Sequence, residues 1–370
     1  VRSVVVGSLA HAKGPYDYAE VDAPSPFTRI GPGPGSIVKP DVVFYGGNAG
    51  MNAGKLEKTG IKSFSIDGTP AYNVGTSFST PWVSRMAAEL THLVKEEFDP
   101  LLIRALLIHN AKYPANNSMS MTDKVTQMGF GAPSSVQEML YNSEDEITLI
   151  LRDTLEKGSF IEMFDFPFPE SLVDKDGNFI GQIIVTLVTK SLLDDKQAGE
   201  YCQSNIDILF GTYETETDRD TSKKGIKNPK GLEEPQNILL ESLYSARVKG
   251  AHPFTGFERE CTLVKYGKKF HPVKKYAIDL SEMTTSNRQR YLRGDRKWYL
   301  KIEGLYRDFI EQDARARNYQ LSQEYFLLLT IRDPNGKAPV YDEVAQQLDY
   351  KNFLHHNIQL RNVVTIDGTL

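Results

Sequence analysis

Residues 73–81 read Asn-Val-Gly-Thr-Ser-Phe-Ser-Thr-Pro, and this stretch decides the fold of the first part of the chain. A short strand, Ala71–Val74, leads into it after an Asp67-Gly68 turn, so a hairpin is expected just before Gly75. From about Pro81 the apolar residues recur with the helical period and form one stripe: Val83, Met86, Ala87, Leu90 and Val94. Ser77 is therefore expected at a strand-to-helix turn, near the positive end of the helix.

This turn allows two interpretations of Ser77. N–H groups at a helix start lack intrahelical partners and can hold a developing oxyanion, which favours a serine nucleophile. Gly75 would permit the tight approach, and Pro81 would fit because the first turn has no intrahelical N–H bond to lose. The alternative is an ordinary Ser/Thr N-cap, which local physics alone favours because such caps are common.

Residues 75–81 resemble the serine signature of subtilisin-like serine peptidases, the subtilase family. In that signature Gly-Thr-Ser is followed by Ser or Ala two positions on, and by Pro two positions further. Four more segments resemble the family in the family's order: Val5–Ser8, Pro26–Pro32, Lys39–Val43 and Gly129–Gly131. The resemblance implies that Ser77 is the nucleophile and a backbone oxyanion donor, with Gly75, Thr76 and Pro81 as supporting motif residues.

The resemblance also implies a fold and a limit to activity. Residues 1–144 would be the C-terminal portion of a doubly wound, parallel α/β peptidase domain. The chain departs from the family at Phe44–Gly47, where Ala-Pro-Gly is usual. Subtilases run Asp, His, Ser along the chain, with an oxyanion asparagine between His and Ser, so those three residues would precede Val1. Since loss of the base costs about 10⁴-fold in turnover, residues 1–370 alone are expected to be inactive.

None of the seven histidines is an obvious substitute base. His92 follows Ser77 by fifteen positions on the predicted helix, roughly 22 Å along its axis. His109 ends an apolar helix expected over 99–112, where a packed structural histidine is the simpler reading. His11, in the loop after the first strand, is the one that distance does not rule out. The others are expected in the second half of the chain, away from catalysis: His252, His271, His355 and His356.

After about residue 145, short runs rich in Ile, Val, Leu, Tyr and Phe alternate with turn clusters. They predict an all-β, jelly-roll-like sandwich over residues 145–370. Asp176-Gly177 indicates a hairpin, and the charged segment 214–236 is expected to be a mobile loop. The predicted strands are Ile147–Leu151, Ser159–Phe164, Ile180–Val188, Ile206–Phe210, Thr262–Tyr266, Trp298–Ile302 and Tyr325–Ile331.

Composition excludes several classes of function. The net charge of −5 argues against a nucleic-acid or anionic-membrane surface, and no apolar run is long enough to span a bilayer. Two cysteines, Cys202 and Cys261, exclude a disulfide-built scaffold but leave one bridge open. No zinc-site spacing occurs, and no cofactor is expected. A longer parent chain is expected because the first residue is not Met, so the compartment is undetermined, with the cytoplasm slightly favoured.

Four short motifs have simpler explanations. Gly47–Lys55 lacks phosphate-loop spacing and is expected to be a Gly/Asn turn. The glycine of Asp174–Asn178 comes too early for an EF-hand, so a hairpin is expected there. Arg293–Asp295 is an adhesion-like tripeptide expected to form a turn, and Asn116 heads a glycosylation sequon of little weight.

Three functions follow as hypotheses. The first is a serine endopeptidase that acts on a peptide or protein substrate through an acyl-enzyme at Ser77. The second is a non-catalytic scaffold or interaction module that retains the subtilase fold. The third is carbohydrate binding by aromatic residues of the β region, although aromatic residues at strand spacing are more often core. Self-association through an exposed face of the nucleophile helix is a further expectation.

Overall fold

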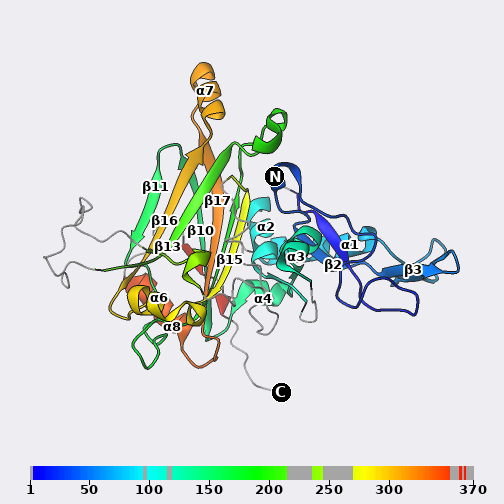
Figure 1. Cartoon of the computed structure of the whole chain (residues 1–370), viewed down its shortest axis with the longest axis horizontal. Coiled ribbons are helices and arrows are strands. Elements are labelled where there is room, and N and C mark those ends of the chain that lie inside the picture. The colour runs from blue at the N-terminus through cyan, green and yellow to red at the C-terminus, as the bar shows by residue number, and fades with distance from the viewer. Residues whose placement is uncertain are drawn as a thin grey trace. The chain divides into compact units, whose positions relative to one another are not determined.

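The computed structural model describes residues 3–94, 98–114, 119–214, 236–244, 270–350, 358–360 and 362–363 (Figure 1). The chain is mixed α/β with several sheets and divides into two compact units. The described residues up to Leu140, joined by Asp195–Tyr201, form the first unit, and the second unit begins at Tyr141.

A parallel strand pair lies at the centre of the first unit. β1 (Val6–Leu9) pairs with β2 (Val42–Tyr45), with Val6 opposite Val42 and Leu9 opposite Tyr45. Helix α1 (Thr76–Leu93) packs against both strands. Parallel pairing with a long crossover is typical of α/β proteins, so this unit is consistent with part of a subtilisin-like α/β domain.

Three further helices accompany this pair: α2 (Pro100–His109), α3 (Met121–Met128) and α4 (Val136–Leu140). The helix predicted over 99–112 is confirmed as α2, whose N-cap Asp99 accepts a hydrogen bond from the Leu101 N–H at 2.8 Å. Two short 3₁₀ turns, η1 (Pro34–Ser36) and η2 (Asp195–Glu200), also lie in the described part of this unit.

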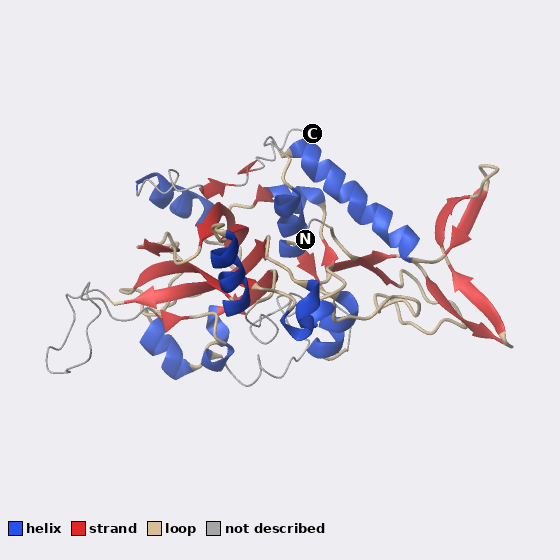
Figure 2. Ribbon diagram, turned by 90° about the horizontal axis from the view of Figure 1, so that it is seen from above, coloured by secondary structure: helices blue, strands red, loops and turns tan. Residues whose placement is uncertain are grey.

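Two antiparallel hairpins and one further antiparallel strand pair, whose strands flank α3 in the chain, also belong to the first unit. They pair β3 (Asn48–Asn52) with β4 (Lys55–Thr59), β5 (Ile61–Phe64) with β6 (Pro70–Asn73), and β7 (Ala111–Lys112) with β8 (Ala132–Pro133). The hairpin predicted at Asp67-Gly68 is confirmed, with a longer loop in which the Ser65 N–H donates to the Thr69 carbonyl at 2.8 Å. Figure 2 shows the two hairpins projecting at the right of the view.

The second unit contains two antiparallel sheets. The five-stranded sheet has the order β15 (Val273–Asp279), β12 (Gln182–Thr189), β17 (Ser322–Arg332), β10 (Glu146–Glu156), β18 (Ile358–Leu360). The four-stranded sheet has the order β11 (Phe160–Phe164), β16 (Lys297–Tyr306), β13 (Ser204–Tyr213), β14 (Gln236–Asn237). A short parallel pair joins β9 (Tyr141–Asn142) to β19 (Asn362–Val363).

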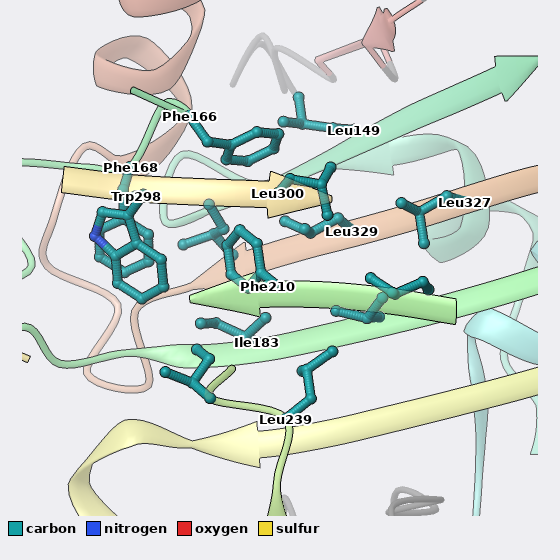
Figure 3. Packing of buried hydrophobic residues seen from close by; sticks show 14 of the residues in the cluster. Leu149, Phe166, Phe168, Ile183, Phe210, Leu239, Trp298, Leu300, Leu327 and Leu329 are labelled. Carbon is teal, nitrogen blue, oxygen red and sulfur yellow. The ribbon is translucent and has the colours of Figure 1, made fainter. Parts of the chain in front are cut away.

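Both sheets contribute to one hydrophobic core (Figure 3). The Trp298 ring stacks on Phe168 with centroids 4.0 Å apart and lies 5.1 Å from Phe210. Helix α8 (Val340–Tyr350) buries Val340 and Val344 in the same core. The other helical segments among the described residues of this unit are α6 (Thr285–Tyr291), α7 (Asp308–Arg317), η4 (Glu241–Leu243) and η6 (Leu280–Glu282).

The prediction of an all-β sandwich over residues 145–370 is therefore not confirmed as stated, because helices pack beside the two sheets. Six of the seven strands predicted in this half are present. The seventh, Thr262–Tyr266, lies outside the described residues, as does almost all of the predicted loop 214–236. The domain boundary near residue 145 and the jelly-roll-like topology stay predictions.

Candidate active site

The strand-to-helix turn around Ser77 is built on a glycine. β6 ends at Asn73, α1 begins at Thr76, and Gly75 between them has φ 148° and ψ 161°. Only glycine adopts this backbone region without strain. Because Gly75 supplies the sharp change of direction, Ser77 lies exposed in the first turn of α1.

Backbone hydrogen bonds place this turn at one edge of the parallel strands. The Gly46 N–H donates to the Leu9 carbonyl at 3.0 Å, and the Gly75 N–H donates to the Gly46 carbonyl at 2.9 Å. Leu9 and Gly46 lie at the carboxyl ends of β1 and β2, so Ser77 lies just beyond the same edge. In open α/β sheets this edge is where ligands bind.

The first N–H groups of α1 are available as donors. The Phe78 N–H donates to the Gly75 carbonyl at 3.0 Å, whereas the N–H groups of Thr76 and Ser77 have no hydrogen bond within the described chain. Gly75 occupies the N-cap and provides no side-chain acceptor. The N-cap interpretation of Ser77 is therefore wrong, because Gly75 is the N-cap and Ser77 is the second residue of the helix.

Pro81 requires a second correction. It was expected in the first turn of the helix, but α1 begins at Thr76 and Pro81 lies in its second turn. A proline there lacks the N–H that would bond to the carbonyl four residues earlier, which is the carbonyl of Ser77. The proline of the motif therefore withholds the usual helical donor from the carbonyl of the candidate nucleophile.

Short polar contacts join the segments around this edge. The buried hydroxyl groups of Ser8 and Ser25 lie 2.8 Å apart, and Ser25 Oγ donates to the Gly47 carbonyl at 2.7 Å. The Ser8 N–H donates to Thr28 Oγ1 at 2.9 Å. A Cβ added at Gly46 would lie 2.3 Å from Ser8 Oγ, so the close packing requires glycine where the family usually has Ala-Pro-Gly.

A buried ion cluster supports the same strands from the opposite end. Asp41, fully buried, accepts hydrogen bonds from Arg104 Nη2 at 2.7 Å, from Lys39 Nζ at 2.5 Å and from the Val5 N–H at 2.8 Å. Burial acts to raise the pKa of Asp41, but the positive charges of Arg104 and Lys39 outweigh it and hold the pKa below its ordinary value. The cluster ties β1 and β2 to α2. The Lys39-Pro40-Asp41 motif is recognisable in the sequence, but the role of Arg104 is not, because Arg104 lies 63 positions after Asp41.

The structure joins no described histidine to Ser77 by a hydrogen bond. His11 follows β1 and is half buried, and its Nδ1 has no partner among the described residues. His92 is exposed in the last turn of α1, and His109 is buried at the end of α2. His271 belongs to the second unit. The three remaining histidines, His252, His355 and His356, lie outside the described residues.

Other chemistry is scarce in the part of the chain that the structure describes. No group of His, Cys, Asp and Glu there could hold a metal ion, and no helix there is long and apolar enough to cross a bilayer. Cys202 is a buried free thiol whose pKa is raised by burial, while Cys261 lies outside the described residues. The hairpin predicted over Asp174–Asn178 is present as a tight loop, closed by an Asp174 N–H bond to the Asn178 carbonyl and flanked by the Val173–Phe179 antiparallel bridge, and the turn predicted at Arg293–Asp295 is confirmed. The expected turn over Gly47–Lys55 is instead most of the β3–β4 hairpin.

Comparison with known proteins supports the first unit's assignment. Residues 2–133 match the model of the subtilase family, peptidase S8. The subtilase resemblance is therefore confirmed for this segment, and it implies a serine peptidase, a class of hydrolase, at the level of the family.

A particular relative adds little about function. The chain is 28% identical over 213 residues to a protein of Sinorhizobium fredii (strain NBRC 101917 / NGR234) described as "Uncharacterized protein y4bN". The match covers 50% of this chain and 48% of the relative, so the chain spans about half the length of that curated relative.

Proposed function

We propose that the protein is a subtilisin-type serine endopeptidase in which Ser77 attacks the peptide carbonyl of a polypeptide substrate. The observation that carries this proposal is the exposed position of Ser77 in the first turn of α1, beside free N–H groups, in a segment that matches the subtilase family. An exposed serine hydroxyl in this position can reach a substrate, and the adjacent N–H groups can stabilise the oxyanion that forms.

The proposed reaction is an acyl transfer. Ser77 Oγ would bond to the carbonyl carbon while its proton passes to a general base, and the Ser77 N–H would donate to the negatively charged oxygen. Collapse of this intermediate would release the amine and leave an acyl-enzyme ester, which water would hydrolyse.

Within the described residues, no histidine is hydrogen-bonded to Ser77 to act as the general base. We propose that the catalytic Asp and His, and the side-chain oxyanion donor Asn, are supplied by residues outside this chain. Without the base Ser77 is an unactivated alcohol, and turnover would fall by about 10⁴-fold. We therefore expect residues 1–370 alone to be an inefficient peptidase.

The second unit is proposed to assist folding or substrate docking. Its two antiparallel sheets share one core, which supports a sandwich-like, jelly-roll-like domain with added helices. Sheet edges in such a domain could receive an extended peptide as an additional strand.

A fluorophosphonate probe tests the proposed nucleophile directly, because it reacts only with an activated serine. We expect labelling in a chain extended upstream in its parent protein, with loss in Ser77→Ala and no loss in Ser84→Ala. Ser84 is a suitable control because it is also an exposed serine of α1.

Each other result has a definite meaning. Absence of labelling in both the extended chain and residues 1–370 would favour the non-catalytic scaffold. Labelling of residues 1–370 without any upstream extension would mean that a residue of this chain activates Ser77, and His11 would be the first candidate.

A further inference from the structure

The β3–β4 hairpin directly follows Phe44–Gly47, where the chain departs from the family pattern, and both of its ends pack on the segment that leads to Ser77. At one end, a Cβ added at Gly47 would lie 2.7 Å from Val74 Cγ1. At the other end, a Cβ at Gly60 would lie 2.5 Å from the Asn73 N atom. The hairpin is therefore anchored at Asn73–Val74, immediately before the turn that carries Ser77.

One face of this hairpin exposes apolar side chains beside a lysine. Met51 pairs directly with Leu56, and Ala49 pairs with Lys58, so these four side chains share a face. Met51 is 44% exposed and Leu56 is 59% exposed. Lys58 lies closer to the base of the hairpin, where its Nζ donates to Asn73 Oδ1 at 3.2 Å. We call Met51, Leu56 and Lys58 the hairpin patch.

The hairpin also has an open edge. Within the described residues, β4 forms a ladder with β3 alone. An unpaired strand edge presents N–H and carbonyl groups that an extended peptide can bond as an added strand.

The local charge indicates what kind of peptide would fit. Residues 48–64 contain Lys55, Lys58 and Lys62 but only one acidic residue, Glu57, whereas the whole chain has a net charge of −5. All three lysines are exposed. Lys58 shares the face of Met51 and Leu56, whereas Lys55 lies on the opposite face with Glu57. On the patch, Lys58 therefore favours a substrate carboxylate, and Met51 and Leu56 favour an apolar substrate side chain.

We infer that the hairpin patch is a specificity-determining docking site for an extended polypeptide substrate that carries apolar and acidic residues a few positions from the bond cleaved at Ser77. The inference rests on the proposed function, because it assigns the substrate class of the same site. The base of the hairpin is anchored at Asn73–Val74, whereas Met51 and Leu56 lie next to its tip. An extended peptide, which advances about 3.3 Å per residue, would therefore run several residues from Ser77 to reach the patch, where Lys58 selects acidic segments.

Fluorescence anisotropy tests the docking site without catalysis. The full chain with Ser77→Ala is titrated into labelled twelve-residue peptides of alternating Leu and Glu, alternating Leu and Lys, or alternating Ser and Glu. The Leu/Glu peptide should bind most tightly. Met51→Thr with Leu56→Thr should raise its Kd about tenfold, and Lys58→Glu should reverse the preference between the Leu/Glu and Leu/Lys peptides.

Matched controls lie in the second unit. Phe160→Thr removes an exposed apolar residue of another strand, and Lys175→Glu reverses an exposed charge in another turn. Neither should change binding of the Leu/Glu peptide. If the apolar double variant loses the hairpin fold, Lys58→Glu still tests the docking site, because it removes no apolar contact.

Three results would overturn the inference: equal affinity for the three peptides, hairpin variants that bind like the parent, or a change of sedimentation coefficient in the hairpin variants without a change in peptide affinity. The last would assign the patch to contact between copies of the chain. Fluorophosphonate labelling separates this inference from the proposed function. Labelling without hairpin-dependent binding overturns the docking site alone, whereas hairpin-dependent binding without labelling supports docking and removes the peptidase.

Discussion

At the scale of single residues, the geometry around Ser77 depends on backbone that only particular residue types provide. Gly75 supplies the turn, and Pro81 withholds a donor from the Ser77 carbonyl. The motif therefore specifies the backbone geometry around the nucleophile as well as the nucleophile itself. The sequence predicts the strand-to-helix turn at Ser77, and α1 does begin there, at Thr76, but the placing of Pro81 in the first turn is wrong.

Gly75→Ala should destabilise the first unit by about 1–3 kcal/mol, because alanine is strained at φ 148° and ψ 161°. No atom lies within 3.4 Å of the added Cβ, so the cost is one of backbone strain. Urea denaturation measures the change in free energy of unfolding.

Gly68→Ala is the matched control for Gly75→Ala. Gly68 has φ 80° at an exposed hairpin tip with open space around its Cβ, so alanine should cost less there, about 1 kcal/mol. Equal costs at the two positions would contradict the special role of Gly75.

At the scale of secondary-structure elements, the ion cluster around Asp41 joins two strands to a helix. Asp41→Asn would leave Arg104 buried without its counter-charge, which typically costs about 3–5 kcal/mol. A surface ion pair of the same unit, Lys13 with Glu20, provides the contrast, and Glu20→Gln should have little effect.

The effect of Asp41→Asn should depend on pH. The pKa of Asp41 is lowered in the folded state, so its contribution to stability is fully present above the unfolded value, about 3.9, and is lost as the pH falls through the folded pKa. The difference in unfolding free energy between the parent and Asp41→Asn should therefore be largest near neutral pH and shrink below about pH 4. A difference that stays constant into strong acid would show that Asp41 is not held ionised.

Elements that escaped prediction share a physical cause. The strand β15 contains adjacent lysines, which read as polar surface, yet Lys274 is buried and its ammonium donates to the Ile206 carbonyl and to Asp207, each at 2.7 Å. The sequence predicts a turn in place of the β3–β4 hairpin, because the glycines and asparagines of this segment are weak strand formers. Tertiary contacts determine the secondary structure of these segments, and a local sequence pattern does not reveal those contacts.

At the scale of the whole molecule, the two units differ in which sequence signal predicts them. Ordered motif matches predicted the first unit, and residues 2–133 match the subtilase family model. Alternation of apolar residues predicted six strands of the second unit, but it could not predict α8, whose apolar residues pack into the sheet core. Periodicity of a single segment does not reveal which layer it covers.

The two tryptophans of the chain allow the units to be followed separately. Trp82 lies in α1 of the first unit and is 43% exposed, whereas Trp298 lies in the core of the second unit and is 3% exposed. The core cluster that contains Trp298 includes no residue of the first unit, so each unit has its own core. Domains with separate cores commonly unfold in separate transitions. Urea denaturation of Trp298→Phe, followed by Trp82 fluorescence, should therefore report the first unit, and Trp82→Phe should report the second.

Asp41→Asn gives this design its internal control. It should lower the midpoint of the Trp82 transition and leave the Trp298 transition unchanged, because Asp41 and all its partners lie in the first unit. Equal shifts of both transitions would show that the units unfold as one cooperative body. In that case the stability of the candidate active site would depend on the second unit, and the proposed role of that unit in folding would gain direct support.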